Sequence, residues 1–355
     1  MTVKPSDSVP ESSPAAVALP SAANFGNSNP ELIADRVRQI ALDMRFDLVG
    51  VAPIEESSHS DYLRSWIASG SFGQMNYLAR TAEGRMNLRA VLPWAQSVIC
   101  VAMSYYTPSH PVPCAEQPVV PSLNQPGAAD VHPVPAKIAR YAWGRDYHRV
   151  LYGRLRQFER LMRREINVSF ESRIYVDTGP CSERELAVRA GLGWMGKNTL
   201  LIHPRHGSWF VLGELVTSLP LPPDQPQLDR CGTCTRCLDA CPTAALTPYR
   251  LDAMRCISYQ TLENRGEIPP ELHEPIRQAG FIVGCDICQE VCPFNRRPLP
   301  SSQADFLPSA PAPAMDAKAA LAWTPAEWDL ATRGRAFRRA KPEMWHRNAR
   351  IILNQ

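Results

Sequence analysis

Apolar positions near the start of the chain recur with the spacing of a helix. Ile33, Val37 and Ile40 are three or four residues apart, so a helix through them would bury one face. Directly before them, Asn29 can cap the helix and Pro30 suits its first position. We therefore expect a helix that begins at residue 30 and packs one side into the core.

Continuous apolar runs farther along the chain predict buried strands. Residues 48–54 and 97–104 are short, apolar and rich in strand-forming residues such as valine and isoleucine. A third strand is expected to end at Asp177, followed by a helix near 181–190 and a fourth strand at 208–217. Strand and helix therefore alternate along this part of the chain.

A longer apolar stripe with helical spacing lies between the second and third strands. It comprises Leu151, Leu155, Phe158 and Met162, on a helix whose opposite face carries arginines. Strands that alternate with helices indicate an α/β (α+β) domain, which we place at residues 30–222.

Composition divides the remainder of the chain into segments. Residues 1–29 are rich in serine, proline and alanine, which predicts a disordered leader. Residues 106–136 contain eight prolines and predict a surface loop within the first domain. Residues 223–300 are rich in cysteine, and residues 301–355 read as a Pro/Ala loop followed by short helices with a basic end.

The composition as a whole is that of an ordinary globular protein. Of the 355 residues, 45% are hydrophobic, and no apolar run is long enough to span a bilayer, so we expect no membrane association. The N-terminus lacks the features of a secretory signal and a twin-arginine pair, so we expect a cytoplasmic location. A net charge of +3 is too small to indicate nucleic-acid binding by itself.

Eight of the eleven cysteines lie in one short stretch, which favours metal binding over disulfides in a chain without a secretory signal. The first group follows the spacing C-x2-C-x2-C-x3-C-P of bacterial ferredoxins, and the second group has only the last three members of that pattern. Cys256 is the candidate for the missing member. In such pairs the fourth cysteine of each motif ligates the other cluster.

We therefore predict two 4Fe-4S clusters. The first would be bound by Cys231, Cys234, Cys237 and Cys292. The second would be bound by Cys241, Cys256, Cys285 and Cys288. Two zinc sites are the alternative, because thiolates also bind zinc, but zinc motifs seldom have this spacing. Of the remaining cysteines, Cys100 suits core packing, Cys114 has no evident partner, and Cys181 is a weak active-site candidate close to Asp177.

Several stretches, some unrelated to cluster binding, carry a resemblance to a known family. They are GQMNYLAR (73–80), RYAWGRDYH (140–148), YVDTGPCSERELAVRAGLGWMGKN (175–198), GSWFVLGEL (207–215), CGTCTRCLDACPTAAL (231–246), RCISYQT (255–261) and GCDICQEVCPFNR (284–296). In these the chain resembles epoxyqueuosine reductases, cobalamin-dependent iron–sulfur enzymes that complete queuosine at the wobble position of certain tRNAs. That family is related to reductive dehalogenases.

The resemblance implies a nitroreductase-like fold for the first domain, with cobalamin beside the second cluster and a ferredoxin-like domain after it. Electrons would pass from a donor, which the sequence does not identify, through both clusters to the cobalt. Asp177 matches the family's proton donor, although an aspartate before Thr-Gly-Pro is also a common turn residue. To act as an acid near neutral pH, Asp177 would need a raised pKa, which burial against the corrin would provide.

The resemblance also implies a set of cobalamin contacts. They are Arg85, Ala139, Asp177, Leu201, Leu212, Ser258 and Asp286. Each has a plain structural alternative: a solvated charge for Arg85, caps of the cluster loops for the two polar residues near the cysteines, and core packing for the two leucines. At position 139 a relative has cysteine, so a side-chain role for Ala139 is doubtful.

The implied partner is the anticodon region of a tRNA, and we expect a monomer. Residues 333–350 carry six arginines and one lysine against one glutamate, with Phe337 and Trp345 interleaved, a pattern that suits phosphate contacts and base stacking. Two other functions use the same parts: a reductive dehalogenase and a two-cluster electron carrier. The basic end disfavours the first, and the size of the preceding domain disfavours the second.

Overall fold

The computed structural model describes residues 29–108 and 133–355. The predicted leader therefore lies almost wholly outside the described residues, as do Cys114 and most of the proline-rich segment 106–136.

The centre of the first domain is a four-stranded antiparallel sheet in the order β1-β2-β7-β4. Its strands are β1 (Leu48–Pro53), β2 (Ser97–Ser104), β7 (Phe210–Thr217) and β4 (Ser172–Tyr175). The predicted strands at 48–54, 97–104 and 208–217 are confirmed. Because every pairing is antiparallel, the architecture is of the α+β kind.

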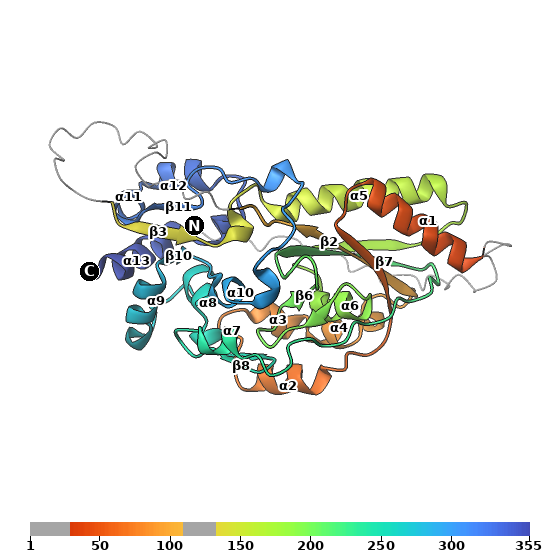
Figure 1. Ribbon diagram of the computed structural model, residues 1–355, viewed down its shortest axis with the longest axis horizontal. Coiled ribbons are helices and arrows are strands. Elements are labelled where there is room, and N and C mark those ends of the chain that lie inside the picture. The colour runs from red at the N-terminus through yellow and green to blue at the C-terminus, as the bar shows by residue number, and fades with distance from the viewer. Residues whose placement is uncertain (1–28, 109–132) are drawn as a thin grey trace, which may run out of the picture.

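Helices cover both faces of this sheet (Figure 1). The helices α1 (Pro30–Asp43) and α5 (Tyr147–Glu165) lie on one face, and α6 (Glu183–Arg189) lies on the other. The side chains of β2 alternate between two separate cores: Ile99 and Val101 pack with α1 and α5, whereas Cys100 and Ala102 pack with α6. This is the two-residue period of a strand buried on both faces.

The predicted starts and stripes of the two long helices are confirmed. The side chain of Asn29 accepts a hydrogen bond from the backbone N–H of Glu31, so it caps α1. The apolar stripe of α5 is buried as expected. Residues 60–80 are helical on both sides of turns at residues 69–74. The helices are α2 (Ser60–Ala68) and α3 (Asn76–Arg80), followed by α4 (Ala82–Met86) and the 3₁₀ turn η2 (Leu88–Ala90).

The cysteine-rich segment consists of short elements that lie beside α2 and α3 of the first domain (Figure 1). Two short strands, β5 (Trp194–Met195) and β6 (Leu201–Ile202), pair with each other just before it. The segment itself contains α7 (Arg236–Asp239), β8 (Leu246–Thr247), β9 (Arg250–Leu251), α8 (Ile257–Leu262), α9 (His273–Ala279), β10 (Phe281–Val283) and α10 (Ile287–Glu290).

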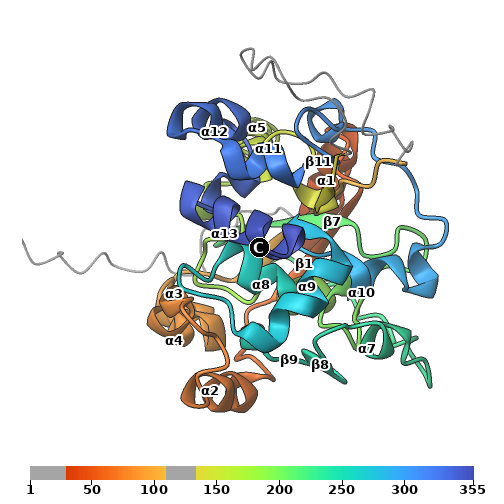
Figure 2. The same ribbon diagram turned by 90° about the vertical axis from the view of Figure 1, so that its left-hand side faces the viewer.

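A small second sheet joins all three segments of the chain in the order β10-β3-β11. Its strand β3 (Pro135–Ile138) belongs to the first segment, β10 to the cysteine-rich segment, and β11 (Ala314–Asp316) to the C-terminal segment. The C-terminal segment also contains α11 (Ala317–Ala322), α12 (Pro325–Thr332) and α13 (Pro342–Leu353), which gather in one layer beside this sheet (Figure 2). The division of the chain into 30–222, 223–300 and 301–355 stays a prediction, and this sheet crosses both boundaries.

Helix α13 is fixed to the cysteine-rich segment by a buried amide. The Nδ2 atom of Asn348 donates to the backbone oxygens of Thr261, at 2.9 Å, and Ile282, at 2.8 Å. Beside it, the guanidinium of Arg347 donates to the backbone oxygens of Gln260 and Asn264. Through these hydrogen bonds the C-terminal segment holds α8 and β10 in place.

The expected role of Phe337 and Trp345 in stacking on bases is wrong. Both side chains are fully buried in the core between the small sheet and α13, where their rings meet edge to face. Several arginines of residues 333–350 are also engaged within the protein: Arg338 pairs with Asp329, and Arg339 pairs with Glu263. The aromatic residues of this segment stabilise the fold.

None of the helices in residues 29–108 and 133–355 is both long enough and apolar enough to cross a membrane.

Replacing Phe337 by alanine tests this structural role. The change should lower the free energy of unfolding by about 3–5 kcal/mol, because it leaves a cavity in a closely packed core. Phe337→Leu, the matched control, should lose much less. Chemical denaturation measures both. A Phe337→Ala protein with unchanged stability and weaker RNA binding would restore the stacking interpretation.

Candidate functional site

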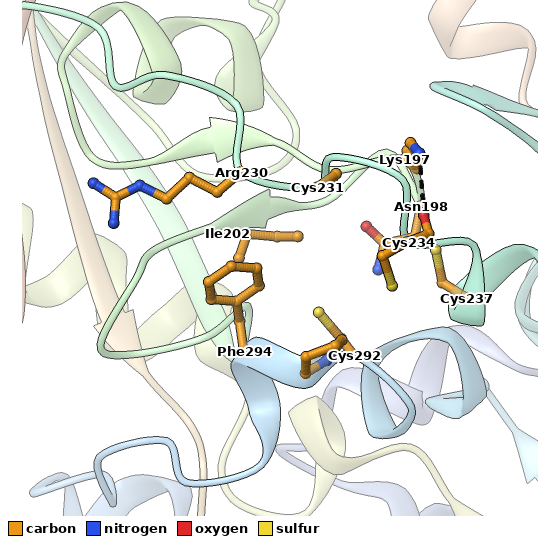
Figure 3. Close-up of a pocket in the computed structure, with 10 residues that line it drawn as sticks. Lys197, Asn198, Ile202, Arg230, Cys231, Cys234, Cys237, Cys292 and Phe294 are labelled. Atoms are coloured by element: carbon orange, nitrogen blue, oxygen red, sulfur yellow. Dashed lines mark hydrogen bonds between the residues drawn. The ribbon is translucent and has the colours of Figure 1, made fainter.

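The first predicted set of cysteines surrounds one cavity. Cys231, Cys234, Cys237 and Cys292 all line a space of about 230 Å³, and Figure 3 shows their side chains around it with Ile202 and Phe294 on the opposite side. Three of these thiols come from the loop before α7 and from α7 itself, and the fourth comes from the turn after α10. The cavity therefore brings together the four cysteines that the cross-over rule assigns to one cluster.

The walls of this cavity are tied to the first domain. The Nζ atom of Lys197 donates to the backbone oxygen of Cys234 at 3.1 Å, which fixes the cysteine loop to the turn after β5. Trp194 packs its ring against Phe294 with the centroids 4.8 Å apart. The indole N–H of Trp194 is buried and has no hydrogen-bond partner among the described residues. Such a donor suits a group with acceptor sulfurs beside Cys231.

The other four cysteines form a second group: Cys241 follows α7, Cys256 caps the start of α8, Cys285 precedes α10, and Cys288 lies in α10. Burial raises the pKa of Cys285, and the neighbouring thiols of Cys256 and Cys241 raise it further. Burial also raises the pKa of Cys288, with the next largest contributions from Cys285 and Cys256. These mutual effects place the four thiols close together.

Backbone N–H groups point at the sulfurs of this second group. Those of Ser258 and Tyr259, in the first turn of α8, donate to the sulfur of Cys256. That of Ile287 donates to Cys285, and that of Ala245 donates to Cys241 at 3.4 Å. Donors aimed at sulfur favour the thiolate that a metal requires.

The thiol sets fit iron–sulfur clusters. None of the ten cysteines in the described part of the chain forms a disulfide. Buried thiols with raised pKa values can ionise only beside a compensating positive charge, which cluster iron provides. Two groups of four thiols match the requirement of two cubanes, with no thiol of either group left over.

A different site lies at the turn after β4, where Asp177 has a φ of 59°. The left-handed backbone is uncommon for a residue other than glycine, so the surrounding contacts must hold it. Its backbone N–H donates to a carboxylate oxygen of Glu183. Its side chain is about half exposed and meets Nε2 of His148 at 3.1 Å.

His148 forms a bridge between two aspartates. Its Nδ1 atom lies 2.7 Å from Oδ1 of Asp146, and its Nε2 atom faces Asp177. Burial alone would lower the pKa of His148, but the two hydrogen bonds and the two negative charges raise it to about 9. At neutral pH the ring is therefore a cation held between two carboxylates.

Within the protein itself, His148 determines the direction in which the pKa of Asp177 is shifted. Burial alone would raise it, but the hydrogen bond and the charge of His148 outweigh that effect and lower the pKa of Asp177 below its ordinary value. The proton of this pair consequently resides on His148. Sequence reasoning missed His148, because nothing in the stretch RYAWGRDYH shows which carboxylates its ring will meet.

Three of the other expected cobalamin contacts lie in the first domain, near the Asp177 turn or in the core under α6. Arg85 braces the turn after Asp177, because its guanidinium donates to the backbone oxygens of Gly179, at 3.0 Å, and Cys181, at 2.8 Å. Leu201 is buried in the core beneath α6, and Leu212 packs against that same core. Core packing therefore accounts for the leucine side chains.

Ala139 and Asp286 lie next to each other, beside the second cysteine group. The backbone N–H of Arg140 donates to Oδ2 of Asp286 at 2.6 Å. A Cβ atom on Gly284 would come 2.4 Å from that of Ala139, so the two backbones approach closely here. Burial raises the pKa of the neighbouring Tyr141, whose ring lies close to Gly284 and meets the ring of Tyr147 edge to face.

Ser258 belongs to the same neighbourhood. Its backbone oxygen accepts a hydrogen bond from Oγ1 of Thr261 at 3.4 Å. The same Oγ1 atom of Thr261 accepts a hydrogen bond from the backbone N–H of Gly284 at 3.0 Å. Polar groups of Ser258, Thr261 and Asp286 thus border the second cysteine group. Such a mixed polar border suits a large cofactor with amide side chains, which is what cobalamin offers.

Comparison with known proteins agrees with both sites. The family described as "Epoxyqueuosine reductase QueG, DUF1730" matches residues 85–178, and the "4Fe-4S double cluster binding domain" matches residues 230–295. The cysteine-rich segment therefore binds 4Fe-4S clusters. An epoxyqueuosine reductase of Synechocystis sp. is 42% identical over 310 residues, which cover 86% of this chain and all of the relative.

Two solved structures are similar over 92% of this chain and 82% of their own. One is an epoxyqueuosine reductase with an epoxyqueuosine-modified stem loop of tyrosine tRNA, with a TM-score of 0.76 at 28% identity. The other is the epoxyqueuosine reductase of Bacillus subtilis, with its catalytic aspartate loop swung out of the active site, with a TM-score of 0.77 at 27% identity.

Serine substitutions should separate the two cysteine groups. Cys292→Ser and Cys288→Ser should each lower the bound iron to about half, because each removes a ligand from a different cluster. Iron and acid-labile sulfide per chain measure this. Cys100→Ala, which changes a buried cysteine outside both groups, should keep all the iron. Complete loss of iron in both serine variants would show that the groups do not bind separate clusters.

Proposed function

The chain belongs to the epoxyqueuosine reductase family, and from this premise we propose that it reduces the epoxide of epoxyqueuosine in tRNA to the alkene of queuosine. The observation that carries this function is the 42% identity to a family member along that protein's whole length. The stem-loop complex of a similar structure supports tRNA as the substrate. Loss of the epoxide oxygen as water requires two electrons and two protons, so the site must supply both.

The cofactors would be held by residues from three parts of the chain. The two cysteine groups would bind the clusters, as the cavity and the directed N–H groups support. Arg85, Ala139, Asp177, Ser258 and Asp286 would border cobalamin, with Leu201 and Leu212 shaping the core behind it. When bound, these groups supply single electrons and the strong reductant needed to open the carbon–oxygen bond.

The protein's own part in the reaction is to deliver a proton. Asp177 faces outward from its turn, and the imidazolium of His148 is hydrogen-bonded to its carboxylate. A substrate that covers this half-exposed carboxylate removes water from it, which favours transfer of the proton from Nε2 of His148 to Oδ2 of Asp177. Asp177 then donates this proton to the leaving oxygen, while Asp146 stabilises the ring of His148. The second proton, which completes the water molecule, follows from solvent by the same route after His148 has been reprotonated. The swinging aspartate loop of the Bacillus subtilis relative supports a mobile acid at this position.

The function is tested with tRNA from cells blocked at the last step of queuosine synthesis. The reduced protein with cobalamin should convert the modified nucleoside to one that is lighter by one oxygen atom, as mass spectrometry of the digested tRNA would show. No change in mass under these conditions would refute the proposed function.

Asp177→Asn tests the acid. The amide keeps the shape of the side chain but cannot donate a carboxylic proton, so turnover should fall by about 10²–10⁴-fold. Cluster iron and cobalamin binding should remain. Asp61→Asn, at an exposed aspartate of α2, is the matched control and should keep full turnover. Full activity in Asp177→Asn would remove Asp177 from the mechanism.

The pH dependence tests His148. Because the pKa of His148 is raised to about 9, its proton is present below that pH and is lost as the pH rises through it. Turnover of the pre-reduced enzyme should therefore fall above about pH 9. In His148→Gln this high-pH decline should disappear and turnover should be low throughout. A variant that keeps the wild-type pH profile would show that another group carries the proton.

A further inference from the structure

Glu214 occupies an unusual position for a carboxylate. It lies in the middle of β7, opposite Cys100 of β2, and it is completely buried. Neither of its carboxylate oxygens has a hydrogen-bond partner among the described residues. An ionised carboxylate without any partner in such a place is very unfavourable, so Glu214 must carry or share a proton.

The neighbour that can share this proton is Glu183, the first residue of α6. A carboxylate oxygen of each glutamate and the sulfur of Cys181 all lie within 4.8 Å of one another. Burial raises the pKa of Glu183, and burial together with the charge of Glu183 raises the pKa of Glu214. Two adjacent carboxyl groups in a site of low polarity do not both ionise, so one proton serves the pair.

Glu183 also contacts the turn that carries the acid. Its carboxylate accepts a hydrogen bond from the backbone N–H of Asp177, the residue with the left-handed backbone. A charged acceptor binds an N–H about twice as strongly as a neutral one. A proton kept on Glu214 leaves Glu183 ionised, and an ionised Glu183 holds the turn in its uncommon conformation.

We propose that Glu183 is a positioning residue that keeps Asp177 aimed at the substrate, and that the buried Glu214 holds the proton which leaves Glu183 ionised. This inference rests on the proposed function only in its effect on turnover. The hydrogen bond to the Asp177 amide can be tested without substrate.

Other titratable and charged groups face this pair or the turn from the elements packed around them. They are Tyr77 of α3, Arg85 of α4, Cys100 of β2, Tyr141 and Tyr147 beside the start of α5, His148 of α5, Cys181, Arg184 of α6 and Arg339 near the C-terminus. Glu183 differs from these groups because it accepts the hydrogen bond from the Asp177 backbone, and Glu214 differs because its buried carboxylate lies next to that acceptor.

The first test is hydrogen–deuterium exchange at the Asp177 amide in the protein with both clusters and without tRNA. Glu183→Ala removes the acceptor, so exchange should speed up by about tenfold or more, the effect of losing roughly 1.4 kcal/mol of protection. Glu183→Gln retains a neutral acceptor oxygen, so its exchange rate should lie between that of wild type and that of Glu183→Ala. Glu185→Ala removes a buried glutamate of the same helix that does not touch the turn, so it controls for loss of stability and should leave this amide unchanged. Unchanged exchange in Glu183→Ala would overturn the proposal.

The second test follows stability with pH in Glu214→Gln. The raised pKa means that the folded protein keeps a proton which the unfolded chain gives up above its ordinary carboxyl pKa, so wild-type stability falls as the pH rises. The glutamine variant carries no such proton, and its melting temperature should gain on that of the wild type between about pH 5 and pH 8. A difference that is constant or has the opposite slope would overturn the shared proton.

Turnover connects the pair to the reaction. In Glu183→Ala, kcat should fall at least about tenfold with the KM for tRNA unchanged, because the acid is misplaced while the binding surface is intact. Glu183→Gln should rescue most of kcat. If every variant and the wild type lack turnover while the exchange result holds, the proposed function fails and the positioning role stands. If turnover is present but exchange and kcat are unchanged in Glu183→Ala, the positioning role fails alone.

Discussion

The need to compensate every buried charge shapes both sites of this molecule. Eight thiols lie in two partly buried groups, and each must ionise to bind metal. The backbone N–H groups of Ser258 and Ile287 are accordingly aimed at sulfurs of the second group. At the cysteine groups the buried negative charges are compensated by iron, whereas at the Asp177 site they are compensated by protons. There, His148 balances two aspartates, and Glu183 and Glu214 share one proton. The buried thiolates and carboxylates thus lie at the two places where a reduction needs electrons and protons.

The two sites are kept together by the small sheet β10-β3-β11. One strand comes from each segment of the chain, and Asn348 fixes the last helix to the cysteine-rich segment from behind. This explains why Phe337 and Trp345 pack inward. Tyr141 connects these parts of the chain, because its ring meets that of Tyr147, next to His148, and lies close to Gly284, which precedes Cys285.

Much of this arrangement could be predicted from local patterns. The capped start at Pro30, the strand at 97–104 and the stripe of α5 are each set by residues close in sequence, and all are confirmed. The cysteine spacing also predicted the set of four that surrounds one cavity. The state of the acid could not be predicted, because the pKa of Asp177 depends on His148, which is 29 residues away in sequence. The isolated glutamate in the apolar strand FVLGELVT was a visible signal that sequence reasoning passed over. The role of Phe337 and Trp345 could not be predicted, because an aromatic residue between arginines has the same sequence pattern whether it packs in a core or binds RNA.

The central claim is that Asp177, supplied with a proton by His148, faces the epoxide oxygen. The most direct measurement is a crystal structure of the reconstituted protein with a stem loop that carries epoxyqueuosine. The account predicts the epoxide oxygen within about 3 Å of a carboxylate oxygen of Asp177, with the ring of His148 still hydrogen-bonded to that carboxylate. An epoxide that faces away from Asp177 and toward another acid would contradict it.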